Sequence, residues 1–199
     1  MTPLILNNPE TAPITDEQFY QICIANRELK LERTAKGDLI IMPPTGGGTG
    51  KRNSDINLDL GLWNRQTQLG VVFDSSTCFQ LPNGAKFSPD AAWIPLAKWE
   101  SLTPEQQEKF PPICPDFVIE LREAKLSRRE SPSEPLKPLQ EKMQEYINNG
   151  TRLGWLINRN NRQVEIYRPG REKEILDNPT TLSGEDILTG FVLNLSLIW

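Results

Sequence analysis

The sequence predicts a single mixed α/β domain over residues 1–199. Its 199 residues match the usual size of one domain. Segments with apolar residues at helical spacing alternate with short runs typical of strands, and neither kind dominates the chain. No internal repeat or low-complexity tract interrupts this order. One packed α/β unit accounts for the whole pattern.

Three segments have the apolar spacing of amphipathic helices. The first begins at Thr15, which has capping-box spacing with Gln18. The second ends near Leu69, because Gly70 is a natural residue for the position after a helix. The third stops at Asn149-Gly150. The predicted helices are 15–29, 51–69 and 136–149, with a short helical turn at 104–109.

Short apolar or alternating runs between turn residues predict the strands. The run Phe117 to Ile119 is continuous rather than alternating, which indicates a central strand buried on both faces. Residues 1–14 are rich in proline and asparagine and are expected to form an irregular lead, and the polar residues 123–135 a loop. The predicted strands are 30–34, 38–42, 71–74, 77–81, 88–94, 117–119, 153–157 and 164–167, with weaker ones near 173–176 and the C-terminus.

The chain contains no histidine, and this removes a large part of enzyme chemistry. Ser-His-Asp and Cys-His triads, H-E-x-x-H zinc proteases and histidine-metal nuclease sites are excluded. Acid–base or metal chemistry must therefore use carboxylates, lysines, tyrosines or cysteines. The net charge of −4 argues against a general electrostatic coat for nucleic acid, but it leaves room for a local basic groove.

The three cysteines, Cys23, Cys78 and Cys114, are far apart and form no CxxC pair, so a thiolate zinc site is not expected. We expect free thiols, buried or half-buried, in a reducing cytosol. The first ten residues have no basic region, and no segment approaches the ~20 apolar residues of a membrane helix. These observations predict a soluble, cytoplasmic protein that does not enter the membrane.

The glycine-rich segment 46–51 (GGGTGK) precedes the second predicted helix and looks like a phosphate-binding loop. Its spacing fails the G-x-x-x-x-G-K-[ST] pattern, because Thr45 stands at the first glycine position and Arg52 at the hydroxyl position. No nucleotide cofactor is therefore expected. Two interpretations remain: a flexible entry loop to the helix, or a place where Lys51, Arg52 and free backbone amides contact nucleic-acid phosphates.

Two carboxylates stand at the ends of apolar runs: Asp90 opens one and Glu120 ends another. Such carboxylates are costly to bury unpaired, and two of them brought together would repel unless Mg²⁺ or Mn²⁺ relieved the repulsion. A metal held there could activate water for attack on a phosphodiester. The structural alternative is that Asp90 caps a turn. In that case Glu120 would form a strand-end salt bridge with Arg122 or Lys142, and spacing alone does not separate the two interpretations.

Five blocks recur in a familiar order: 32–47 (ERTAKGDLIIMPPTGG), 88–93 (SPDAAW), 115–122 (PDFVIELR), 139–147 (LQEKMQEYI) and 149–157 (NGTRLGWLI). In this order they resemble the Uma-type family of restriction endonuclease-like proteins. The resemblance covers about residues 15–195, and the order of the blocks makes it specific. It implies a restriction-endonuclease-like fold of the α/β (α+β) class, with a mixed sheet flanked by helices and a PD-(D/E)xK active site.

The resemblance also implies roles for individual residues. Asp90 matches the motif aspartate and Glu120 the (D/E) position. The motif lysine would fall on residue 122, which is arginine here, and the resemblance places it instead on the following helix, at Lys142. Asp90, Glu120 and the backbone carbonyl of Leu121 would then bind Mg²⁺ or Mn²⁺, and Lys142 would assist the attacking water.

Other matches and departures concern the surroundings of this site. Glu32 matches an acidic position of the first block and is expected at the edge of the site. Relatives pass almost directly from the strand into a Ser-x-Ser-Asp segment, whereas here residues 123–130 intervene as an insertion. The insertion creates a second E-x-K, so Lys125 competes for the lysine role, although the block around Lys142 favours Lys142. The histidine that many relatives place near the Pro-Thr-Gly loop is absent.

We therefore expect a Mg²⁺-dependent DNA endonuclease, acting as a homodimer as restriction-type nucleases often do. The first alternative is a non-catalytic nucleic-acid-binding descendant of the fold, which the acidic net charge and the insertion favour. A second alternative is a protein-interaction domain with tryptophans at a dimer face, although most tryptophans are core residues. The candidate phosphate contacts are Lys51, Arg52, Arg128 and Arg129, and the candidate dimer-face tryptophans are Trp93, Trp99, Trp155 and Trp199.

Overall fold

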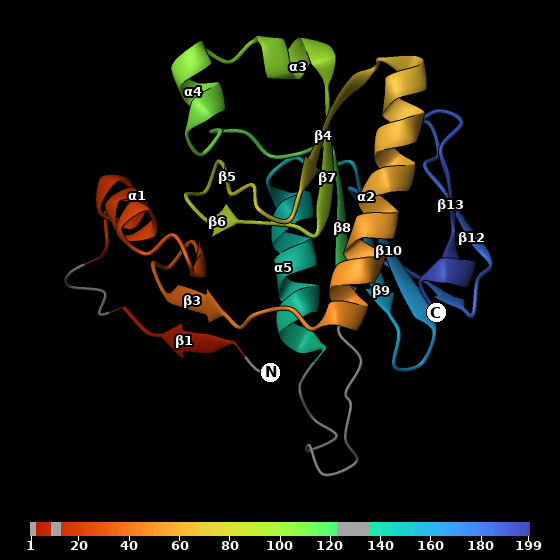
Figure 1. Ribbon diagram of the computed structural model, residues 1–199, viewed down its shortest axis with the longest axis horizontal. Coiled ribbons are helices and arrows are strands. Elements are labelled where there is room, and N and C mark those ends of the chain that lie inside the picture. The colour runs from red at the N-terminus through yellow and green to blue at the C-terminus, as the bar shows by residue number, and fades with distance from the viewer. Residues whose placement is uncertain (1–2, 9–12, 123–135) are drawn as a thin grey trace.

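A six-stranded mixed sheet forms the centre of the computed structural model, which describes residues 3–8, 13–122 and 136–199 (Figure 1). The strand order is β11-β10-β9-β8-β7-β4. β8 and β9 are parallel, and every other pair of neighbours in this sheet is antiparallel. The strands are β4 (Gly70–Asp74), β7 (Ala91–Pro95), β8 (Phe117–Arg122), β9 (Leu153–Asn158), β10 (Gln163–Tyr167) and β11 (Glu174–Asp177).

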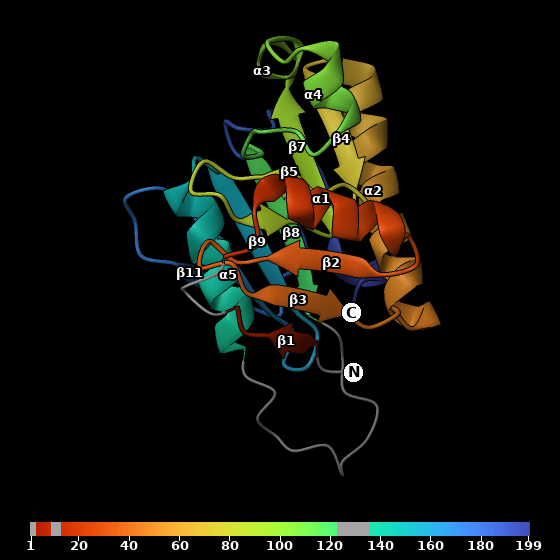
Figure 2. The same cartoon turned by 90° about the vertical axis from the view of Figure 1, so that its left-hand side faces the viewer.

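The middle of this sheet is buried on both faces. Every residue of β9, and every residue of β8 except the last, is buried, which confirms the prediction of a central strand at Phe117 to Ile119. Helix α2 (Gly47–Thr67) covers one face and helix α5 (Lys137–Asn148) the other, as Figure 2 shows. Because side chains alternate along a strand, Ile119 packs in the core with α2 while Val118 packs in the core with α5.

A second sheet of five strands, in the order β1-β3-β2-β6-β5, lies beside the first. Helix α1 (Asp16–Ala25) lies along β2 (Figure 2) and buries Phe19 against Leu31 and Cys78. The strands are β1 (Leu4–Leu6), β2 (Lys30–Arg33), β3 (Leu39–Met42), β5 (Phe79–Gln80) and β6 (Lys86–Phe87).

The remaining elements pack into the cores on the two faces of the six-stranded sheet. Helices α3 (Leu96–Glu100) and α4 (Pro104–Glu108) connect β7 to β8, and strands β12 (Thr181–Ser183) and β13 (Val192–Asn194) form a separate pair. A 3₁₀ turn over Leu195–Leu197 follows β13 and packs into the same core as α2. None of the described helices is long and apolar enough to cross a membrane.

The helices follow the predictions except at their ends. The capping box of Thr15 and Gln18 is present. Helix α1 ends at Ala25 and not at residue 29, because Asn26 follows as its C-cap and donates from its side chain to the carbonyl of Ile22. The predicted start of α2 at residue 51 is also wrong, because Gly47 to Gly50 are already helical. The expected flexible entry loop is therefore the first turn of the helix.

Gly70 does not end α2 as predicted. Gln68 caps the helix in the left-handed conformation, with φ 54°, and Gly70 begins β4. A Cβ atom on Gly70 would lie 2.2 Å from the Ile94 carbonyl oxygen and 2.5 Å from the Trp93 ring. The glycine is therefore required by the close approach of β4 to β7.

Several strand predictions are corrected as well. The prediction of an irregular lead over 1–14 is wrong for Leu4–Leu6. These residues form β1, whose backbone N–H and C=O groups find hydrogen-bond partners in β3. The strand predicted over 88–94 begins only at Ala91, after a bend at Asp90. The predicted loop over 123–135 lies outside the described residues. The three cysteines are free thiols, half-buried or buried, as expected.

Candidate active site

Strand register brings Asp90 and Glu120 together, although thirty positions separate them in the sequence. Ala91 pairs with Ile119 in the antiparallel ladder of β7 and β8. Asp90 precedes Ala91 and Glu120 follows Ile119, so these two residues lie opposite one another. The backbone N–H of Leu121 donates to Asp90 Oδ2 at 2.8 Å. The aspartate side chain is thereby held against the strand that carries the glutamate.

Lys142 reaches the same place from α5. Its Nζ atom lies 2.8 Å from Glu120 Oε1 and 2.8 Å from Glu32 Oε1. All three side chains are removed from water, with exposed fractions of 11% for Lys142, 7% for Glu120 and 2% for Glu32. The strand-end salt bridge of the structural interpretation is therefore present, and the same contact places the amine where the catalytic interpretation requires it.

Glu32, which was expected at the edge of the site, contacts the same Lys142 amine from the second sheet. Its Oε1 atom accepts from Lys142 and from the backbone N–H of Ser88, at 2.9 Å. Glu32 belongs to β2 of the second sheet, so its position depends on how the two sheets pack. The hydrophobic pattern of the sequence does not predict how the two sheets pack against each other.

The charges of the cluster do not balance, and this determines its protonation. Burial raises the pKa of Glu120 to about 7, and Asp90 and Glu32 push it in the same direction while Lys142 opposes them. Burial alone would lower the pKa of Lys142, but the attraction of Glu120 and Glu32 outweighs it and the pKa lies above the ordinary value. One amine cannot neutralise all the neighbouring carboxylates, so the cluster favours an additional proton on Glu120.

Tyr146 belongs to the site as well, although it was not among the site residues expected from the sequence. Its hydroxyl donates to Glu120 Oε1 at 3.3 Å. Burial, together with the nearby Glu120, raises the pKa of Tyr146 well above its ordinary value, so the phenol stays protonated. Its spacing of four residues from Lys142 on a helix is the signal that could have revealed it, because such residues share one face.

Two asparagines of α2 hold Asp90 and were missed in the sequence. Asn53 Nδ2 donates to Asp90 Oδ1 at 2.9 Å, and Asn57 Nδ2 donates to the Asp90 carbonyl at 2.9 Å. They lie one turn apart, on the part of α2 that also carries the buried Ile56. Two asparagines four residues apart on a helix, beside a stripe of buried apolar residues, could have indicated a polar contact at the edge of the core.

The donor set at this site fits a small, hard divalent cation such as Mg²⁺. Asp90 and Glu120 follow on from the pairing of Ala91 with Ile119, and the charge of Asp90 contributes to the raised pKa of Glu120. Within the described ranges, no group of three or more His, Cys, Asp and Glu side chains is arranged to hold a metal ion. A pair of carboxylates with a backbone carbonyl, that of Leu121, matches the way Mg²⁺ is held when water and a phosphate complete its shell.

The two basic residues predicted as phosphate contacts lie at the first turns of α2, immediately before Asn53. Lys51 is largely exposed and pairs with Asp55 at 2.6 Å. Arg52 donates to the carbonyls of Ile198 and Gly48, at 2.8 and 2.6 Å, so it ties α2 to the C-terminal segment. Lys51 is therefore the more available of the two for a phosphate.

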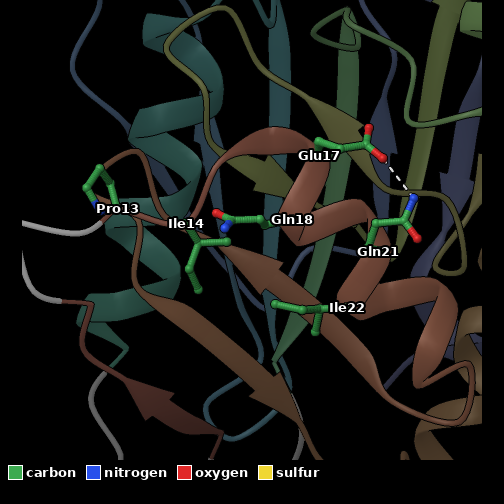
Figure 3. Close-up of a pocket in the computed structure, with 6 residues that line it drawn as sticks. All are labelled: Pro13, Ile14, Glu17, Gln18, Gln21 and Ile22. Carbon is green, nitrogen blue, oxygen red and sulfur yellow. Dashed lines mark hydrogen bonds between the residues drawn. The ribbon is translucent and has the colours of Figure 1, made fainter.

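The other candidates from the sequence lie elsewhere. Lys125, Arg128 and Arg129 are outside the described residues. Trp93 and Trp155 are buried in the core, so the dimer face predicted from the four tryptophans is wrong for these two. A hollow along α1 is lined by none of the site residues; Figure 3 shows it, lined by Pro13, Ile14, Glu17, Gln18, Gln21 and Ile22.

Comparison with known proteins shows the family and the fold of the chain. The family model Uma2, described as "Putative restriction endonuclease", matches residues 16–196. The chain belongs to the Uma2 family. The resemblance found in the five sequence blocks is therefore confirmed. Curated proteins yield no significant match.

The fold of this Uma2 protein is also that of a solved structure. It is similar to the crystal structure of a "putative nuclease belonging to DUF820" from Anabaena variabilis, with a TM-score of 0.67 and 21% sequence identity. The match covers 86% of this chain and 89% of the other. The predicted restriction-endonuclease-like class, a mixed sheet flanked by helices, is confirmed.

Proposed function

We propose that this Uma2 protein is a Mg²⁺- or Mn²⁺-dependent DNA endonuclease whose catalytic residues are Asp90, Glu120 and Lys142. One observation carries the proposal: the Lys142 amine lies 2.8 Å from Glu120, and strand register places Asp90 opposite that same glutamate. Two carboxylates and a lysine amine are the parts of a PD-(D/E)xK site. The presence of these three side chains supports the proposal, in which α5 supplies the amine in place of the usual lysine position.

Each residue has a stated task in this proposal. Asp90, Glu120 and the Leu121 carbonyl would hold the metal ion, which supplies charge neutralisation at the phosphorus and a more acidic water. Lys142 is protonated and orients the attacking water or the scissile phosphate through its N–H groups. Glu32 fixes the amine by accepting from it, and Tyr146 donates to Glu120.

DNA and a second copy of the chain are the proposed partners. Lys51 and Arg52 would contact backbone phosphates beside the site, since they precede Asn53 on α2. With a net charge of −4, this contact must be local. We also propose that residues 1–199 act as one domain and that two copies pair, as in the restriction-type nucleases that the chain resembles.

The direct test is plasmid nicking by the full chain in Mg²⁺ or Mn²⁺. Asp90→Asn keeps the shape of the side chain but removes its charge, so it should abolish nicking. Asp177→Asn is the matched control, because Asp177 is exposed on β11 and remote from the cluster in sequence and strand order. Equal nicking by wild type and Asp90→Asn would overturn the assignment.

A second candidate function is metal-free nucleic-acid binding by a descendant that has lost catalysis. The observation favouring it is that Lys142 is already paired with both Glu32 and Glu120 and is nearly buried. Calorimetry with Mn²⁺ separates the two candidates. Salt-dependent DNA binding without any Mn²⁺ binding would support this second function and contradict the first.

A further inference from the structure

We infer that Asn53 is a further oxygen donor of the candidate site, whose Oδ1 atom contacts the divalent cation or its bound water beside Asp90. The inference rests on the proposed function, since it concerns the same cation. It assigns a ligand role to a residue of α2, an element that carries none of the three proposed catalytic residues.

The orientation of the Asn53 amide is fixed by its neighbour. The Asn53 nitrogen donates to the carboxyl oxygen Asp90 Oδ1, 2.9 Å away, and so it faces that residue. Asn57 is fixed in the same way, because its Nδ2 faces two acceptors, the carbonyls of Asn53 and Asp90, both at 2.9 Å. Neither amide can be turned around without placing oxygen against oxygen.

This orientation leaves a buried oxygen without a donor. Asn53 Oδ1 is buried from bulk solvent and has no hydrogen-bond partner among the described residues, and the same is true of Asn57 Oδ1. Buried acceptors of this kind are rare in native proteins and call for a bound water or ion. Asn64, on the same helix, shows the ordinary case: it donates to the Gly70 carbonyl and accepts from Trp93 Nε1.

The surroundings select a cation and not an anion as the missing partner. Asn53 Oδ1 belongs to the same amide group that contacts the Asp90 carboxylate, and Glu120 is the residue opposite Asp90 where the pairing of Ala91 with Ile119 is extended by one position. Amide and carboxylate oxygens are typical ligands of hard divalent cations. Asn57 contacts only backbone carbonyls at this site, so its effect is to position Asp90, whereas Asn53 adjoins the carboxylate itself.

The test measures Mn²⁺ binding to the full chain by calorimetry, together with thermal unfolding in EDTA and in Mn²⁺. Asn53→Leu removes both polar atoms at similar volume and should weaken Mn²⁺ binding about tenfold. Asn53→Asp places a second carboxylate against Asp90. It should lower the melting temperature in EDTA, and Mn²⁺ should raise that temperature more than it does for the wild type.

Asn64→Asp is the matched control, because its amide is already satisfied and lies three turns further along α2. It should lower stability equally with and without Mn²⁺. If wild type binds Mn²⁺ while both Asn53 variants bind and respond as wild type does, the inference alone is overturned. If wild type binds no Mn²⁺, the inference and the metal-dependent function are overturned together.

Discussion

Lys142 is the residue on which the buried charges of the molecule depend. It contacts Glu32 on the second sheet and Glu120 on the first, so its amine joins the two sheets as well as neutralising part of their charge. Buried ion pairs add little net stability when compared with apolar packing. The loss of one partner is nevertheless expensive, because the other charge stays buried.

Replacing Lys142 with methionine tests this dependence. Two buried carboxylates would lose their cation, so we expect a loss of about 3–5 kcal/mol in the free energy of unfolding at neutral pH. Urea denaturation measures it. Lys109→Met provides the comparison, because Lys109 forms an exposed pair with Glu105 and its loss should cost far less stability than the loss of Lys142. Similar losses in the two variants would contradict the prediction.

The free energy of unfolding should change with pH because the Glu120 carboxyl titrates differently in the native and unfolded states. Burial raises the pKa of this carboxyl to about 7 from its ordinary value of 4.5, so the native state holds the proton more tightly than the unfolded chain. The resulting stabilisation is complete below about pH 4.5 and is lost as the pH rises through 7, by up to about 3 kcal/mol. Because the chain has no histidine, few other side chains titrate in this window.

Unfolding in urea at pH 5, 6, 7 and 8, with EDTA present, measures this effect. Glu120→Gln cannot titrate and should flatten the profile, while Glu108→Gln on the exposed end of α4 should leave it unchanged. A slope that persists in Glu120→Gln would mean that another group is responsible.

Among the elements, β4 and α2 show how a glycine can be required or tolerated. A Cβ on Gly70 would collide with the Ile94 carbonyl, whereas a Cβ on Gly61, inside α2, would meet nothing within 4 Å. Gly70→Ala should therefore lower the free energy of unfolding by about 1–3 kcal/mol. Gly61→Ala should raise it by about 0.5–1 kcal/mol, because alanine is the better helix former. Thermal unfolding of both variants checks the opposite signs.

Features that depend on a short stretch of sequence could be predicted, whereas features that depend on contacts between distant segments could not. Asp90, Glu120 and Lys142 could be identified because their blocks are local and ordered, and the structure brings these three residues together. Glu32 was expected at the edge of the site only from the family resemblance, and the strand Leu4–Leu6 was not anticipated, because the positions of both depend on contacts between distant segments. Asn53 falls inside the predicted helix 51–69, but it was missed as a site residue because its contact with Asp90 joins positions 37 residues apart.

For the whole molecule, the question is how an acidic protein would approach DNA. Binding through a few local cations should be weak and strongly reduced by salt. Fluorescence anisotropy in EDTA, at rising salt concentration, measures it without cleavage. Lys51→Gln should lower the slope of log K against log salt by about 1, whereas Lys109→Gln should leave it unchanged. Equal slopes for the two variants would remove Lys51 from the contact surface.

The parallel pair β8 and β9 has one more consequence, because α5 is the crossover between them. Glu120 lies before the segment 123–135 and Lys142 after it, yet both are positioned by packing against the same sheet. The distance between carboxylate and amine is thus independent of the length of the chain that joins them. A change in the length of that segment would therefore leave the two halves of the site together.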